Sequence, residues 1–319
     1  MEANLNSSKV ASSNTAAPEA PVSTLRMLAV DIGGTNLKAA LLIYGKLQQH
    51  REIPSEAKKG APIMLEHVHE LIAMYDPADY DCIGISTAGT VDPVEGVIVY
   101  ANENIPKYTG TRMKELMEAR YGKPTFVQND GKAAAFGELH YGAGRGFNVL
   151  MCIAYGTGIG GGVVTNGTVH YGSHGGAGAV GHIFTHAGGK LCTCGQRGCY
   201  ECYASVTALM NMLTEAGLPY TSGRQLMAAL PGDARAEAVL DEWILEICYG
   251  LTTLAHTLQP EAFILGGGIM EQPLIIDKIR QRLPELIMPG FRGVQVLPAQ
   301  LGNNAQLYGV LAVAEKHLH

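Results

Sequence analysis

Residues 27–53 read "MLAVDIGGTNLKAALLIYGKLQQHREI", and this stretch sets the architecture expected of the whole chain. Residues 27–34 form a short apolar run that ends in Asp-Gly-Gly, and residues 37–53 predict a β-hairpin that turns at Gly45. A second strand–glycine–strand segment, "NVLMCIAYGTGIGGGVV", occupies residues 148–164. A pattern that occurs twice in this way is typical of a duplicated two-domain architecture.

Strands and helices alternate along the rest of the chain. Buried-strand patterns occur at residues 80–86, 124–130 and 262–269. Helical patterns occur at residues 62–75, 111–122, 131–142, 203–217, 236–260 and 304–318, with Thr111 as a possible N-cap and Gly122 as a stop. This alternation predicts the α/β class.

The segment "DIGGTN", Asp31 to Asn36, is a first candidate for phosphate binding. Its glycines, Gly33 and Gly34, expose backbone N–H groups that can approach phosphate oxygens closely. The Asp31 carboxylate beside them can hold hydrated Mg²⁺. An ordinary glycine hairpin turn explains the segment equally well.

Two further glycine-rich segments also follow strands. "YGTGIGGG", Tyr155 to Gly162, can wrap a polyphosphate, and the hydroxyl of Thr157 adds a donor. It lacks the Gly-Lys-Ser/Thr ending of a P-loop and the strand–helix context of a dinucleotide site. "LGGGI", residues 265–269, allows a flat base to lie on bare backbone. Taken alone, each is also compatible with a plain glycine turn.

The segment "QNDGKAAAFGE", residues 128–138, passes from a strand into a helix at Asn129 and Asp130. A carboxylate there can accept the proton of a hydroxyl that attacks a phosphoryl group. A helix cap is the more common role for an aspartate in this position, and on this segment alone the cap is the favoured interpretation.

Residues 182–202 contain four of the seven cysteines and two histidines. One histidine and three cysteines form a standard closed tetrahedral zinc set, and such a site is structural because no position remains for water. The predicted ligands are His182, Cys192, Cys194 and Cys199. Cys202 is left over, and His174 and His186 are rival ligands.

Composition limits the remaining function classes. The 319 residues suggest one large or two medium domains, and the net charge of −6 argues against general nucleic-acid binding and against an anionic membrane surface.

Residues 1–26 are rich in Ser, Ala and Asn, lack the apolar core of a signal peptide and predict a disordered tail. A cytosolic location follows from that reading. Thiols stay reduced there, and clustered cysteines then bind metal more often than they pair.

Together and in this order, these segments resemble the ROK family of sugar kinases and sugar-responsive repressors. The resemblance runs from about residue 27 to the end and includes "GISTAGTVD" (84–92) and "GCYECYAS" (198–205). It implies a two-domain actin-like, RNase H-like ATPase fold with an interdomain cleft. The implied division is residues 27–128 plus 302–319 for the smaller domain and 129–301 for the larger one, with a zinc-binding loop at 182–202. It also implies ATP and Mg²⁺, phosphorylation of a sugar hydroxyl, usually O6, and a homodimer.

The resemblance also implies a role for each site residue. Asp130 is the catalytic base. The sugar-binding residues are Asn104, Asn129, Asp130, His182 and Glu201, and His182 also binds zinc. The ATP-binding residues are Asp31, Gly33, Gly34, Thr35, Asn36, Gly156, Thr157, Gly158, Gly160, Gly267 and Gly268.

The sequence departs from the family pattern at two positions. Ala179 stands in "AVGH" where kinases of this family commonly have a glutamate that contacts the sugar, which leaves the identity of the sugar open. Lys132 stands in "NDGKAAA" where asparagine is usual. Its side chain is expected to be exposed, with an influence on phosphate binding as the alternative.

Three functions compete on this basis. A sugar kinase accounts for all the glycine loops. A sugar-sensing repressor of the same family would carry a basic winged helix, and only about 26 residues with one Lys and one Arg precede "MLAVDIGG". A zinc-ribbon interaction module leaves the glycine loops unexplained. Within the kinase hypothesis, the substrate is a hexose, a hexosamine or a β-glucoside, with plain glucose as the alternative.

Overall fold

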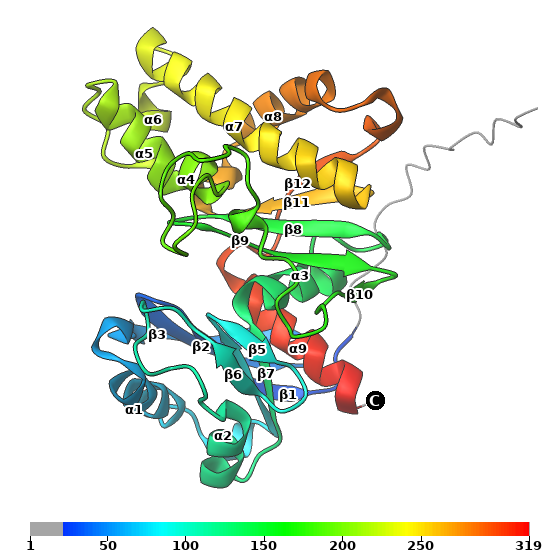
Figure 1. Ribbon diagram of the computed structural model, residues 1–319. Coiled ribbons are helices and arrows are strands. Elements are labelled where there is room, and N and C mark those ends of the chain that lie inside the picture. Colours follow the sequence, from blue (N-terminus) through cyan, green and yellow to red (C-terminus); the bar gives the residue numbers. More distant parts are fainter. Residues whose placement is uncertain (1–21, 319) are drawn as a thin grey trace, which may run out of the picture.

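The structure, a computed structural model, describes residues 22–318 and arranges them in two α/β lobes stacked on a central pair of helices (Figure 1). This confirms the predicted α/β class. Most of the predicted tail, residues 1–21, lies outside the described residues.

The first lobe is built on a five-stranded sheet. Its strands, in spatial order, are β3 (Lys46–Pro54), β2 (Asn36–Ile43), β1 (Arg26–Ile32), β4 (Cys82–Thr87) and β7 (Thr125–Asn129). Strands β3, β2 and β1 form the predicted antiparallel meander, and β4 and β7 continue it in parallel. Successive side chains of β1 point to opposite faces, so Leu28 and Val30 enter one core while Met27 and Ala29 enter another.

The second lobe repeats this topology. Its sheet has the order β10 (Thr168–Val169), β9 (Ile159–Thr165), β8 (Leu150–Tyr155), β11 (Ala262–Gly266) and β12 (Gln295–Pro298). Again three antiparallel strands are followed by two parallel ones. The repetition of one topology is what the two strand–glycine–strand segments predict.

Helices α3 (Asp130–Tyr141) and α9 (Ala305–Leu318) lie between the two sheets and share one apolar core with the inner face of each (Figure 1). They approach closely through glycines. A Cβ added to Gly309 would lie 1.8 Å from the carbonyl oxygen of Ala133, and one on Gly137 would lie 2.2 Å from that of Ala305. The chain therefore crosses between the lobes at a contact that only glycine permits.

The other helices cover the outer faces of the sheets. On the first lobe these are α1 (Ala61–Ile72) and α2 (Met113–Tyr121). On the second lobe they are α4 (Glu201–Ala204), α5 (Val206–Glu215), α6 (Gly223–Ala229), α7 (Ala234–Leu258) and α8 (Pro273–Leu286). The sequence patterns did not predict α6, α8, β12 or the small hairpin of β5 (Thr90–Asp92) and β6 (Val97–Tyr100).

Two predicted helix ends can be compared with the structure. Gly122 ends α2 in the left-handed conformation, as expected, with φ of 62°. The N-cap of α2 is Arg112 rather than Thr111, and its side chain makes no capping hydrogen bond. Among residues 22–318, no helix is both long enough and apolar enough to cross a bilayer.

Candidate active site

A pocket of about 550 Å³ opens between the lobes. Both lobes and the first turn of α3 contribute to its wall. Its lining includes Gly34, Gly89, Tyr100, Asn104, Asn129, Asp130, Lys132, Gly160, Ala179, His182 and Cys194. The structure thus brings together four of the five predicted sugar-binding residues, and it adds Lys132.

Asn129 fixes the start of α3. It is the N-cap, and its side-chain Oδ1 accepts the Lys132 N–H at 3.1 Å. Its Nδ2 donates to the carbonyl of Gly89 at 2.9 Å and to Asp130 Oδ1 at 2.8 Å. The interpretation of Asp130 as the cap is therefore wrong, because Asn129 fills that role and orients the Asp130 carboxylate toward the pocket.

The environment of Asp130 suits a proton acceptor. Burial raises the pKa of its carboxyl, while hydrogen bonds from the Gly131 N–H and the Asn129 amide lower it again. A raised pKa makes the carboxylate more basic than an ordinary aspartate, which favours removal of a proton from a hydroxyl.

Asp31 lies one residue before the end of β1, at the same end of the first-lobe sheet as Asn129 and Asp130, and is only 8% exposed. Ser86 donates a hydrogen bond to its Oδ1 at 2.8 Å. Burial raises the pKa of Asp31 to about 6, the Ser86 hydrogen bond opposes the rise, and the charge of Asp130 adds to it. A buried carboxylate with one hydroxyl partner, beside a glycine turn, is a donor set that fits Mg²⁺.

The first glycine loop is a tight turn. The Gly33 N–H donates to the Asn36 carbonyl at 3.0 Å, and Gly34 and Thr35 are exposed to the cleft. The side chain of Asn36 instead donates to Glu52 on β3. The Thr35 carbonyl accepts the Ser55 N–H at 2.8 Å, so the backbone N–H groups of Gly34 and Thr35 are the part of this loop that could meet a phosphate.

The second glycine loop, residues 156–160, separates the first pocket from a second one of about 830 Å³. The Gly156 N–H donates to the Gly158 carbonyl at 2.9 Å. Gly156 and Thr157 line the second pocket, whereas Gly160 lines the first. A chain of phosphates lying over this loop would connect the two pockets.

The third glycine run closes the second pocket. Gly267 has φ of 101°, and a Cβ there would lie 2.0 Å from the Tyr155 carbonyl oxygen, so glycine is required. Gly268 lines the pocket. Other lining residues that were not predicted from sequence include Val206, Thr207, Met210, Gly223, Arg224 and Met227. Their apolar members follow ordinary helical spacing, which cannot be told from core packing.

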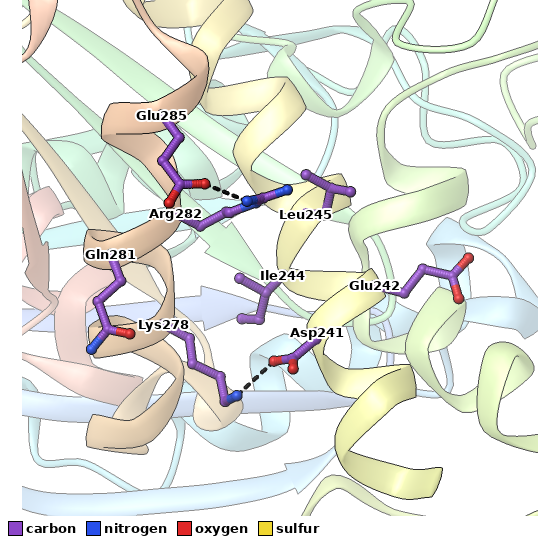
Figure 2. Close-up of a pocket in the computed structure, with 8 residues that line it drawn as sticks. All are labelled: Asp241, Glu242, Ile244, Leu245, Lys278, Gln281, Arg282 and Glu285. Carbon is purple, nitrogen blue, oxygen red and sulfur yellow. Dashed lines mark hydrogen bonds and ion pairs between the residues drawn. The ribbon is translucent and has the colours of Figure 1, made fainter. Parts of the chain in front are cut away.

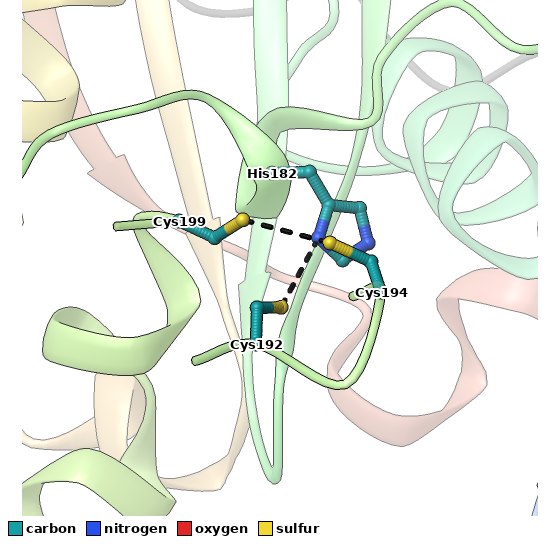
Figure 3. A group of neighbouring side chains, drawn as sticks. All are labelled: His182, Cys192, Cys194 and Cys199. Atoms are coloured by element: carbon teal, nitrogen blue, oxygen red, sulfur yellow. Dashed lines mark hydrogen bonds between the residues drawn. The ribbon is translucent and has the colours of Figure 1, made fainter. Parts of the chain in front are cut away.

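The predicted metal ligands come together in one cluster. The ligand atoms of His182, Cys192, Cys194 and Cys199 all lie within 4.8 Å of one another (Figure 3). Cys192 Sγ lies 3.7 Å from His182 Nδ1, and Cys194 Sγ lies 3.6 Å from Cys199 Sγ. Ligands about 2.3 Å from a tetrahedral zinc are about 3.8 Å apart, so the four groups fit that ion.

The rival ligands lie outside this cluster. His186 stacks on Tyr203 with ring centroids 3.8 Å apart, and its Nε2 lies 3.4 Å from Glu246. Cys202 and His174 are not among the four clustered groups either.

Glu201 occupies a different place from the other predicted sugar ligands. One carboxylate oxygen accepts the Cys192 thiol at 3.0 Å and lies 3.8 Å from His182 Nδ1. The other accepts the Ile159 N–H at 3.3 Å. Glu201 therefore connects the cysteine cluster to the second glycine loop, and its contact with a sugar stays a prediction.

The expectation that Lys132 is exposed is wrong. Lys132 is 5% exposed, because α3 packs against β9 and α9 from its first turn onward. The sequence does contain a signal for burial of Lys132: the lysine stands in an alanine-rich helix. A helix with small apolar side chains on all faces can be buried on every side.

One more hollow lies on the outer face, between α7 and α8, with a volume of about 530 Å³ (Figure 2). Four of its charged groups form ion pairs, Lys278 with Asp241 at 2.6 Å and Arg282 with Glu285. None of the predicted site residues lines it.

Comparison with known proteins agrees with this geometry. The sequence model of the ROK family matches residues 27–317. A glucokinase of Streptomyces coelicolor is 32% identical over 316 residues, which cover 91% of this chain and 97% of the relative. An N-acetylmannosamine kinase of Vibrio cholerae is 28% identical over 285 residues, which cover 89% of this chain and 98% of that relative. A crystal structure of a ROK family glucokinase from Streptomyces griseus, in complex with glucose and AMPPNP, superposes with a TM-score of 0.81. It is 31% identical and covers 91% of this chain and 99% of that one.

Proposed function

The chain belongs to the ROK family and is an ATP-dependent sugar kinase, and from this premise we propose that it phosphorylates O6 of a hexose, a hexosamine or a β-glucoside. The observation that supports the proposal is the position of Asp130. Its carboxylate lies in the 550 Å³ pocket, next to the glycine loop that leads into the 830 Å³ pocket.

The two pockets suit the two substrates. ATP would place its adenosine between α5, α6 and Gly268, and its phosphates over Gly156, Thr157 and Gly158 toward Gly34. The sugar would bind beside Asn104, Asn129 and His182. Backbone N–H groups of the two loops would hold the phosphate oxygens without side chains in the way.

The reaction needs one proton acceptor. Asp130 would take the proton of the sugar hydroxyl as its oxygen attacks the γ-phosphorus. The bond from that phosphorus to the β–γ bridging oxygen breaks, and ADP leaves with the bonding electron pair. Mg²⁺ held at Asp31 would neutralise part of the negative charge of the phosphates.

The cysteine cluster is proposed to bind structural zinc. Four protein ligands close the coordination sphere, so the ion would not act on the sugar. It would instead tie His182, which lines the sugar pocket, to Cys192 and thereby to Glu201 and the second glycine loop. Zinc would then preorganise both substrate sites.

The pocket also bears on which sugar is used. Ala179 is exposed and lines the pocket, and Tyr100, 61% exposed, lines it as well. A volume of about 550 Å³ lies within the ~300–1,000 Å³ typical of small-molecule pockets. With alanine at position 179, the pocket would have room for a substituent on the hexose, and plain glucose is the alternative substrate.

The deciding experiment is a coupled ADP-release assay with a panel of sugars, followed by NMR of the phosphorylated product. Release of ADP with one sugar and a phosphorus coupling at C6 would support the proposal. Absence of sugar-dependent ADP release across the panel would contradict it. We further propose that the kinase is a cytosolic homodimer, in line with the family resemblance, which light scattering would test.

A further inference from the structure

Lys132 is a charged side chain that the proposed mechanism has not used. It lies in the first turn of α3, with its backbone N–H bound to Asn129, and it is 5% exposed. Within residues 22–318, its ammonium forms no ion pair and no hydrogen bond. A buried lysine without a partner is unfavourable in the free protein, so a bound group is the natural candidate to compensate it.

The surroundings of Lys132 indicate which group that is. Lys132 lines the same pocket as Asp130, Gly34 and Gly160. Its Cα packs against β9, since a Cβ on Gly162 would lie 3.3 Å from it. The side chain thus starts beside the strand that leaves the second glycine loop.

The position of Lys132 relative to Asp130 also points to the transferred phosphoryl group. An attacking hydroxyl must come within about 2.6–3.2 Å of Asp130, and the phosphorus bonds directly to that oxygen. Lys132 and Asp130 line one pocket, and the charge of Asp130 acts on the Lys132 ammonium, so the two charged groups lie near each other.

We propose that Lys132 is a further catalytic residue, whose ammonium contacts an oxygen of the phosphoryl group as that group passes from ATP to the sugar hydroxyl. The inference rests on the proposed function. In this step the bond from the γ-phosphorus to ADP breaks and the bond to the sugar oxygen forms. Asp130 takes the hydroxyl proton, and Lys132 donates a hydrogen bond without transferring a proton.

Charge distinguishes this role from contact with the sugar. The neutral hydroxyls of a sugar can form hydrogen bonds with the amides of Asn104 and Asn129 and with the imidazole of His182. The oxygens of the transferred phosphoryl group, in contrast, carry negative charge. A charge-assisted hydrogen bond to such an oxygen is stronger than one to a hydroxyl. The N-terminus of α3 adds positive potential at the same place. Burial lowers the pKa of Lys132, and the nearby Asp130 charge raises it again, so an anion in the pocket helps to keep the ammonium protonated.

The test compares the wild type with Lys132→Met, Lys132→Ala and Lys132→Arg, using the sugar that the wild type phosphorylates. We expect Lys132→Met to lose about 10²-fold or more in kcat, in the range for loss of one transition-state donor, with the KM for the sugar within threefold. Lys132→Arg should recover part of kcat. Ethylammonium should raise kcat of Lys132→Ala, and the same concentration of NaCl should not.

The control is Lys123→Met. Lys123 is also partly buried, but its ammonium binds the Tyr80 carbonyl and it lies outside the pocket. Thermal melting of all variants separates misfolding from loss of function, and if Lys132→Met does not fold, the amine rescue of Lys132→Ala decides. An unchanged kcat, or a raised sugar KM at normal kcat, would overturn the proposal. If the wild type itself releases no ADP with any sugar, the proposed function fails instead.

Discussion

Asp31 in β1 and Asp130, directly after β7, lie at the same end of the first-lobe sheet, and the charge of Asp130 acts on the ionisation of Asp31. Burial raises the pKa of Asp31 to about 6, and the negative charge of Asp130 contributes to the rise. Under the proposed function, a cation and a phosphoryl group would be held near these two carboxylates, one beside a glycine loop and one at a helix start.

Replacement of Asp130 by Asn should abolish most phosphoryl transfer. The amide cannot accept the hydroxyl proton, and loss of a general base lowers kcat by about 10²–10⁴-fold. ATP affinity, measured by calorimetry, should stay near that of the wild type because the 830 Å³ pocket is untouched. Asp241→Asn on α7 is a control of the same chemistry outside the cleft. Near-normal turnover of Asp130→Asn would show that this carboxylate only orders the helix start.

The pH profile of kcat/KM should carry the signature of the raised Asp130 pKa. The base is active when ionised, so activity is lost as pH falls through its pKa. Because burial raises that pKa above 3.8, the acid limb should lie at higher pH than an ordinary aspartate would give. The measurement is kcat/KM at saturating ATP and Mg²⁺ from pH 4 to 8. A profile that stays flat down to pH 4 would contradict the assignment.

One equivalent of zinc should copurify with the protein, and Cys194→Ser should lose it. Loss of the ion should raise the sugar KM, since the cluster holds His182 at the pocket. Cys202→Ser is the matched control, because Cys202 lies outside the four-ligand cluster and should keep zinc. Plasma emission spectroscopy and sugar kinetics are the readouts. Stoichiometric zinc loss with unchanged sugar KM would separate the metal from substrate binding.

Substitution of Ala179 by Glu should shift substrate preference toward glucose. The added carboxylate could accept hydrogen bonds from sugar hydroxyls, and a hydrogen bond to a charged group is worth roughly 1.5–3 kcal/mol. This corresponds to about a ten- to hundredfold gain in kcat/KM for glucose. Cellobiose, an aryl β-glucoside and N-acetylmannosamine should become poorer substrates of the variant. A wild type that prefers glucose over every substituted sugar would refute the larger-pocket hypothesis.

Gly309→Ala should destabilise the contact between α3 and α9. The new methyl group would meet the Ala133 carbonyl oxygen at 1.8 Å, and overpacking of this kind costs about 1–3 kcal/mol or more. Gly290→Ala is the control, since a Cβ there has nothing within 4 Å. Urea denaturation would measure both. An unchanged midpoint for Gly309→Ala would mean that the two helices separate easily.

Local patterns were sufficient for much of this protein. Apolar runs and glycine turns predict the first strand meander and two strands of the second, β8 and β9, because side-chain direction in a strand depends only on adjacent residues. The spacing of His182, Cys192, Cys194 and Cys199 predicts the metal cluster, since four ligands within 18 residues leave few other arrangements.

Tertiary packing decided what local patterns could not. Lys132 is buried because two sheets and α9 surround its helix; the neighbouring alanines permit this burial but do not show which elements cover the helix. Asn129, and not Asp130, caps that helix because the backbone turns one residue earlier. Glu201 contacts Ile159 across 42 residues, and α5 and α6 line the same pocket as Gly268. Each of these is a contact between distant segments, and their energies depend on the whole packed structure rather than on the identity of neighbours along the chain.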